Sequence, residues 1–139
     1  CNRGKRSLAI DLKSEAGIEA VKKLVARADV LLHNYRPGVM DRIGLGSDAL
    51  REINPKLVYV AVSGFGTEGP MADLPAFDHV IQGIAGFTDL QAPDDGKFDF
   101  IRTFICDKVT AYTVCQAATA ALLARATTGE GQHIDISML

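Results

Sequence analysis

The amino-acid sequence predicts an α/β fold in which residues 1–139 form a single domain, a Rossmann-like, open and mostly parallel sheet with helices on both faces. Two apolar runs, at 29–33 and 57–63, carry this prediction. The run at 29–33 is short and lacks helical spacing, which is typical of a strand buried in a parallel sheet. The run at 57–63 is rich in β-branched residues, which favour a strand. Segments with helical periodicity lie between such runs, so strands and helices are expected to alternate along the chain.

The first part of the chain is expected to form a βαβ unit. Residues 7–12 alternate weakly between apolar and polar side chains and predict a strand. Ser14 is a candidate N-cap for an amphipathic helix over 15–28, because apolar side chains recur there at helical spacing. The strand at 29–33 follows at once, and its connection to the first strand is expected to be right-handed.

The rest of the chain is expected to add four helices and two strands. The loop at 64–70 is rich in glycine, but it lacks the Gly-Lys-Ser/Thr ending and the glycine order of a phosphate-binding loop. The expected elements, in order, are a short helix after Gly38, a helix at 47–53 capped by Ser47, the strand at 57–63, a helix at 77–84, a loop at 87–97 with a turn at 94–96, an extended segment at 98–105, an alanine-rich helix at 107–126 and a strand at 132–138.

The composition is that of an ordinary globular domain, with 47% hydrophobic and 23% charged residues. No apolar run approaches the roughly 18 residues of a membrane span, and neither a membrane nor a nucleic acid is expected as a partner. The first 42 residues carry nine Lys and Arg against five Asp and Glu, an excess that suits a phosphorylated ligand. The alternative is a solvated helix face, which explains Lys22, Lys23 and Arg27 better than it explains the basic residues before position 7.

The cysteines indicate the compartment in which the protein works, and the chain ends indicate how much of the protein this chain represents. Cys1, Cys106 and Cys115 are scattered without the spacing of a metal site, which favours a reducing cytoplasm and predicts no metal. The chain begins without a methionine and stops inside or just after an expected strand. We therefore expect it to be a fragment of a longer protein.

Two polar side chains follow the strand at 29–33. Asn34 and Arg36 lie in a tight turn that Pro37 and Gly38 continue, before a helical pattern begins. Ligands bind at the carboxyl ends of parallel strands, and a helix N-terminus there offers N–H groups to an anion. This turn is therefore a candidate site for an anionic ligand. The alternative is an ordinary βα loop with one solvated arginine.

Asp107 is the strongest catalytic candidate, because it follows an apolar segment and starts a long helix. The helix dipole favours the charged carboxylate, which could attack an activated acyl group. The alternative is an N-capping aspartate without a chemical role. Asp78, on the helix beside the glycine-rich loop, is a candidate second acid, with a surface charge as the alternative. Cys106 is expected to be a buried, inert thiol.

Four stretches of the sequence resemble the family III CoA-transferases, which include formyl-CoA transferase and carnitine CoA-transferase. They are NRGKRSLAIDLKSEAG, ADVLLHNYRPGVMDRIGLG, INPKLVYVAVSGFGTEGP and TGEGQHIDISML. They occur in the family's order and at about its spacing, over essentially the whole chain. The resemblance implies an enzyme that moves coenzyme A between carboxylic acids, with acyl-CoA and carboxylic acid substrates. It also implies a longer parent chain and a homodimer in which the two chains interlock.

The resemblance also implies roles for individual residues. Asp107 matches the family's nucleophile, which forms a mixed anhydride with the acyl group and then an aspartyl-CoA thioester. Asp78 matches an acidic position near that nucleophile. The positions that match contacts to CoA are Ile10, Lys13, Asn34, Tyr35, Arg36, Val39 and Arg42.

Two alternative functions remain open. The same superfamily contains α-methylacyl-CoA racemases, which use a histidine immediately before the position of Asp78 and an aspartate at the position of Asp107. Phe77 occupies the histidine position here, which weakens this interpretation because phenylalanine cannot move a proton. The second alternative is a non-catalytic domain that binds CoA or another protein.

Overall fold

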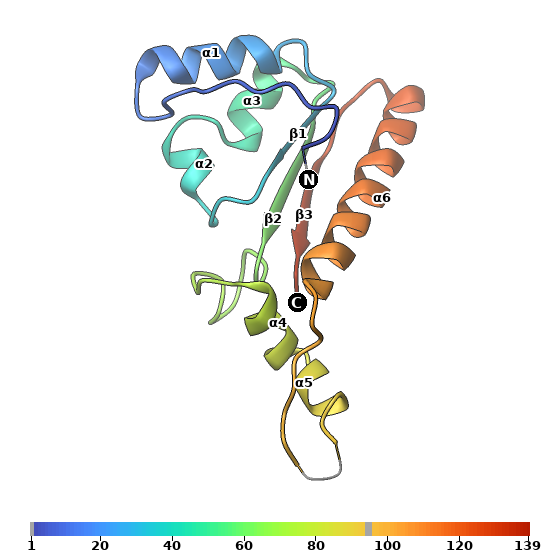
Figure 1. Ribbon diagram of the computed structural model, residues 1–139. Coiled ribbons are helices and arrows are strands. Elements are labelled where there is room, and N and C mark those ends of the chain that lie inside the picture. Colours follow the sequence, from blue (N-terminus) through green and yellow to red (C-terminus); the bar gives the residue numbers. More distant parts are fainter. Residues whose placement is uncertain (1, 94–95) are drawn as a thin grey trace.

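The computed structural model describes residues 2–93 and 96–139. In Figure 1, three strands form one sheet between the helices, and α4 and α5 extend below it, beyond the carboxyl ends of β2 and β3. The elements in chain order are α1 (Glu15–Val25), β1 (Val30–His33), α2 (Val39–Arg42), α3 (Ser47–Ile53), β2 (Val58–Ser63), α4 (Asp78–Ile84), α5 (Phe87–Leu90), α6 (Ile105–Thr128) and β3 (His133–Ser137).

The central strand of the sheet is β2. The strand order is β1-β2-β3, and both neighbours run parallel to β2. Val30 pairs with Val58 on one side, and Tyr59 pairs with His133 on the other. Val58, Tyr59 and Val60 are all buried, because neighbouring strands cover the edges of β2 and side chains from the helices cover its faces. The prediction of a strand at 57–63 is confirmed. The strand predicted to be buried at 29–33 forms as β1, but it lies at the edge of the described sheet and Leu32 is 54% exposed, so its predicted burial is wrong.

Each face of the sheet has its own hydrophobic core, because alternate side chains of β2 point to opposite faces. Leu57 and Tyr59 pack against α1, α2 and α3. Val58 and Val60 pack against α6, where Ala121 is the buried contact. Figure 1 shows the same division, with α1 to α3 on one side of the strands and α6 on the other. The prediction of helices on both faces is confirmed.

The strand expected at 7–12 does not form, so the predicted βαβ unit is wrong. This segment runs irregularly beside α1, and Leu8 is 65% exposed. The reason is a turn at Asp11, whose backbone carbonyl accepts hydrogen bonds from the backbone N–H and the hydroxyl of Ser14. Gly17 packs on the same carbonyl so closely that a Cβ would overlap the oxygen, which requires glycine there.

Ser14 caps α1 as predicted, since its Oγ accepts a hydrogen bond from the backbone N–H of Gly17. The helix ends at Val25, earlier than the expected end at 28. The Asn54 side chain accounts for the difference, because its Nδ2 donates to the carbonyl oxygens of Val25 and Ala28, both at 2.9 Å. The end of α1 is thereby tied to the end of α3.

Two expectations in the middle of the chain are corrected. Ser47 is the first residue of α3 rather than its N-cap, a position that Gly46 occupies. Gly46 lies against the Asp41 side chain, and a Cβ there would overlap that carboxylate. The expected loop at 87–97 begins with a short helix, α5. The turn expected at 94–96 lies partly outside the described residues.

The last helix, α6, is longer than the predicted helix at 107–126, because it begins at Ile105 and ends at Thr128. Residues 98–104, which were expected to be extended, form no strand; the Gln82 side chain binds backbone groups in this segment instead. The closing strand predicted at 132–138 is confirmed as β3. Within the described ranges, no helix combines the length and apolarity that a bilayer crossing requires.

Replacing Leu50 by alanine should lower the free energy of unfolding by about 2–5 kcal/mol, because a deleted core side chain leaves a cavity. Leu50 is 0% exposed in the core formed with α1 and α2. Urea denaturation followed by circular dichroism measures the change. The matched control is Leu8→Ala at an exposed position, which should change stability by less than about 0.5 kcal/mol. Equal effects of the two substitutions would contradict this assignment of the core.

Candidate functional site

A cavity of about 650 Å³ lies at the carboxyl ends of β1 and β2. Several parts of the chain that are distant in sequence form its walls, including residues 62–64 at the end of β2. Residues 32–37 run from the end of β1 into the following turn, residues 74–77 precede α4, and the first turns of α6 face them. The parallel pairing explains this meeting, because parallel strands release their connections at the same edge of the sheet.

Four of the residues singled out from the sequence line this one cavity. Asn34, Tyr35 and Arg36 contribute from the turn after β1, and Asp107 contributes from α6. All four are exposed, so their polar groups are accessible. The cavity therefore combines an accessible carboxylate with a guanidinium and an amide, on an apolar surface that includes Leu32 and Val62.

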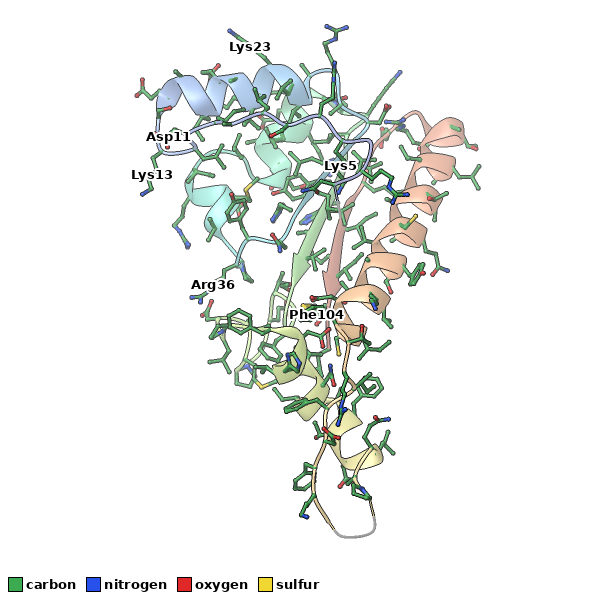
Figure 2. All side chains as sticks on the ribbon, in the orientation of Figure 1. Lys5, Asp11, Lys13, Lys23, Arg36 and Phe104 are labelled. Atoms are coloured by element: carbon green, nitrogen blue, oxygen red, sulfur yellow. The ribbon has the colours of Figure 1, made fainter. Side chains whose placement is uncertain are left out.

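Arg42 lies beside the turn without lining the cavity. Gly38 has a left-handed conformation, with φ of +71°, and forms the N-cap of α2. The guanidinium Nη1 of Arg42 lies 3.3 Å from the position that a Cβ on Gly38 would occupy, so this side chain folds back over the turn. In Figure 2, Arg36 projects outward from the same turn. Two guanidinium groups thus flank the turn, while Val39 is half-buried in α2.

Ile10 and Lys13 lie outside the cavity, in the irregular segment that leads into α1. Ile10 is half-buried and Lys13 is exposed. The backbone N–H of Lys13 donates to Oδ1 of Asp11 at 2.9 Å, which fixes the turn and leaves the lysine side chain outside it. Figure 2 shows Lys13 and Arg36 at the left edge of the molecule, on different loops.

Asp107 is the third residue of α6 and does not cap the helix. The N-cap position belongs to Phe104, whose side chain makes no capping hydrogen bond. The interpretation of Asp107 as a local N-cap is therefore wrong. Its backbone N–H donates to Oδ2 of Asp78 at 2.9 Å, and the residue lines the cavity.

Asp78 is buried, with 4% of its surface exposed, so the interpretation as a surface charge is wrong. Both carboxylate oxygens accept hydrogen bonds: Oδ1 from the Gln82 amide and Oδ2 from the Asp107 backbone. Asp78 is not a lining residue of the cavity. Its hydrogen bond to Asp107 is made to the backbone N–H.

Gln82 is a residue of this site that the sequence analysis missed. It is 0% exposed, and its amide bonds to Asp78 and to the backbone of Ile101 and Thr103. Its spacing of four residues from Asp78, on a predicted helix, is the signal that could have found the pair. A glutamine on a helix is otherwise typical of a solvated surface, so the pattern alone did not indicate burial.

Cys106 is buried between the two aspartates. Burial raises the pKa of the Cys106 thiol, and the negative charges of Asp78 and Asp107 raise it further. This agrees with the expectation of an inert thiol. Among the residues that the structure describes, no group of three or more His, Cys, Asp or Glu side chains could hold a metal ion.

A second cavity of about 410 Å³ lies on the opposite face of the sheet. The rings of His33 and His133 each pack edge-on against Tyr59, with centroids 5.2 Å apart. Burial, then the charges of Asp41 and Asp135, raise the pKa of Tyr59 to about 12. Burial, then the neighbouring His133, lower the pKa of His33. The raised pKa keeps the Tyr59 hydroxyl protonated near pH 7, and the lowered pKa of His33 favours its neutral imidazole. His33, Tyr35 and Arg36 line both cavities.

Comparisons with known proteins agree on one family. The sequence profile of CoA-transferase family III matches residues 1–139. Over 138 residues, the chain is 39% identical to a succinate–glutarate CoA-transferase of Agrobacterium fabrum and 41% identical to an acetyl-CoA:oxalate CoA-transferase of Acetobacter aceti. These matches cover 99% of this chain but only 34% and 36% of those proteins. The chain therefore spans about a third of the length of the curated relatives it matches.

Among solved structures, a CAIB/BAIF family protein from Brucella suis superposes with a TM-score of 0.96 at 42% sequence identity. The match covers 99% of this chain and 36% of that chain. The superposition confirms the α/β fold class over nearly all of the present residues.

Cys106 and Cys115 should differ in their rate of alkylation. We expect iodoacetamide at pH 8 to label the exposed Cys115 at least about ten times faster than the buried Cys106, because the raised pKa of Cys106 leaves little thiolate. Mass spectrometry of the peptides gives both rates. In urea-unfolded protein the two rates should converge. Equal rates in the folded protein would contradict the burial of Cys106 between the aspartates.

Proposed function

The chain belongs to CoA-transferase family III, and from this premise we propose that it is part of an enzyme that moves CoA between two carboxylic acids through an aspartyl-CoA thioester on Asp107. The observation that carries the proposal is that Asp107, which is exposed, lines the same cavity as Asn34, Tyr35 and Arg36. Because the chain spans about a third of its curated relatives, the activity is proposed for the whole protein of which residues 1–139 form a segment.

The first half-reaction transfers CoA to the enzyme. A carboxylate oxygen of Asp107 attacks the thioester carbonyl of the donor acyl-CoA; the C–S bond breaks, and CoA leaves as a thiolate. The product is a mixed anhydride between Asp107 and the donor acyl group. The thiolate then attacks the aspartyl carbonyl and displaces the donor as a free carboxylate, which leaves Asp107 as a thioester of CoA.

The second half-reaction returns the enzyme to its starting state. The acceptor carboxylate attacks the aspartyl thioester, expels the CoA thiolate and forms a second mixed anhydride. The thiolate attacks the acceptor acyl carbon, so acceptor acyl-CoA leaves and the Asp107 carboxylate is regenerated. Each attack is on a thioester or an anhydride, which is already activated, and we assign no metal to any step. The donor and the acceptor acid are not assigned.

We propose that the turn after β1 binds CoA. Arg36 and Arg42 flank this turn, and a guanidinium can bond two phosphate oxygens at once. Asn34 offers an amide, and Tyr35 offers an aromatic surface that is 47% exposed. Further contacts to CoA are proposed for Ile10 and Lys13, in the segment before α1, and for Val39 in α2. These three residues do not line the cavity.

The racemase alternative receives less support. The position before Asp78 holds Phe77, which lines the cavity and is 70% exposed but carries no proton to exchange. Asp78 itself is buried and makes two hydrogen bonds, so we assign it a place next to the nucleophile's backbone rather than contact with substrate. A racemase would exchange the α-proton of a 2-methylacyl-CoA in heavy water without an acceptor acid.

We further propose that the whole protein acts as a homodimer in the cytoplasm. The outer face of α6 supports the dimer, because Val109, Tyr112 and Leu123 are 55%, 79% and 74% exposed on it. Large apolar side chains gathered on one helix are typical of a surface that a second protein chain covers.

In the full open reading frame that encodes this chain, Asp107→Asn should lower the rate of CoA transfer by at least about 10³-fold, because the substitution removes the nucleophile. The variant should also form no acyl-enzyme that hydroxylamine cleaves, as intact-protein mass spectrometry would detect. Asp89→Asn is the matched control, since Asp89 is exposed on α5. Unchanged transfer by the Asp107 variant would exclude the proposed mechanism.

Arg36→Ala and Arg42→Ala should each weaken CoA binding by about 1–3 kcal/mol if the guanidinium groups meet phosphates. The effect should shrink as ionic strength rises, because added salt screens exposed charges. Isothermal titration with CoA measures both trends. Arg27→Ala, at an exposed position beyond the end of α1, is the control and should leave the affinity unchanged. A variant whose affinity equals that of the parent removes its arginine from the site.

A further inference from the structure

The start of α6 is capped from another helix. A helix N-terminus is usually capped by the side chain of its own N-cap residue, which accepts a hydrogen bond from the N2 or N3 backbone N–H. Here that residue is Phe104, which has no acceptor in its side chain. Figure 2 shows Phe104 at the junction between α6 and the segment that leads into it. The acceptor for the N–H of Asp107 is instead Oδ2 of Asp78, at the start of α4.

The cap is itself held by Gln82, one turn further along α4. Nε2 of Gln82 donates to Oδ1 of Asp78 at 2.5 Å, which leaves Oδ2 for the Asp107 backbone. The same amide nitrogen lies 3.1 Å from the carbonyl oxygen of Thr103 and 3.4 Å from that of Ile101. Its Oε1 accepts the backbone N–H of Ile101 at 2.9 Å. One fully buried side chain thus joins α4, the segment entering α6 and the cap of α6.

We propose that Gln82 is a positioning residue for the Asp107 carboxylate, a role that rests on the proposed function of Asp107. Gln82 and Asp78 set where α6 begins, and Asp107 belongs to the first turn of that helix. A shift of about 1 Å in a reacting group can slow a reaction on the order of 10²-fold. Gln82 does not line the cavity, and its hydrogen-bond path to Asp107 runs through the Asp78 carboxylate to the Asp107 backbone N–H.

The amide of Gln82 is chemically specific for this role. It donates to a carboxylate through one end and accepts a backbone N–H through the other. Methionine has similar length but can do neither. Glutamate can do both only while it is protonated, because its O–H would donate to Asp78 and its carbonyl oxygen would accept from Ile101. Two adjacent buried carboxyls share a proton readily, since the second negative charge raises the pKa of the first.

The test compares two substitutions in the full open reading frame. Gln82→Met should lower kcat by about 10- to 100-fold and change KM for acyl-CoA by less than about twofold, because binding through the turn after β1 is untouched. Gln82→Glu should keep more activity at pH 6 than at pH 8, relative to the parent, because its shared proton is lost as the pH rises. A purely structural role would not introduce this new pH dependence.

The control is Gln91→Met, at an exposed position that follows α5, which should leave kcat and its pH profile unchanged. A folded Gln82→Met variant with the kcat of the parent would overturn the proposal. If that variant fails to fold, Gln82→Glu decides: a pH profile parallel to that of the parent also overturns it. A parent enzyme that forms no hydroxylamine-sensitive intermediate would instead overturn the proposed function itself, before any Gln82 variant is compared.

Discussion

The pairing of β2 with a parallel neighbour on each side is the constraint on which the rest of the structure depends. It fixes the register between Val30 and Val58 and between Tyr59 and His133, so the ends of all three strands are set relative to one another. The turn after β1 and the first turns of α6 then meet at one edge. The candidate site is a consequence of this pairing, because no single segment contains both its carboxylate and its guanidinium groups.

A second constraint acts on the entry to α6. The segment before this helix forms no strand, so its backbone groups need partners other than a sheet. The amide of Gln82 supplies three of them, at Ile101 and Thr103. Burying an amide and a carboxylate is favourable only when their polar atoms are bonded, and here Asp78 and Gln82 bond to each other. The polar pair therefore orders a stretch of chain that has no regular structure of its own.

The sequence was sufficient to predict features that depend on local patterns. The apolar run at 57–63 predicted a strand, and the rule that parallel strands bind ligands at their carboxyl ends predicted a ligand site at the turn that holds Asn34 and Arg36, which lines the cavity together with Asp107. The strand prediction holds because a strand covered on both faces appears in the sequence as an uninterrupted apolar run. The family resemblance added residue roles that the pattern alone could not supply.

The misses come from contacts between distant residues. The weak alternation at 7–12 suggested a strand, but a turn at Asp11 directs the chain into α1 before any pairing can occur. The start of α6 was misjudged because its cap comes from Asp78, 29 residues earlier. Burial of Gln82 likewise depends on the path of the segment around Ile101, which periodicity does not encode.

Asp78 holds position 107 by a hydrogen bond to the backbone N–H, so this contact does not depend on the side chain at that position. Every amino acid except proline carries the N–H that Asp78 accepts, so the same cradle would offer a hydroxyl, a thiol or an imidazole to the cavity at the same point. The residues that hold position 107 are therefore separate from the side chain that would react there. A single substitution at position 107 would change the reactive group while the hydrogen bond to Asp78 and the surrounding fold stay the same.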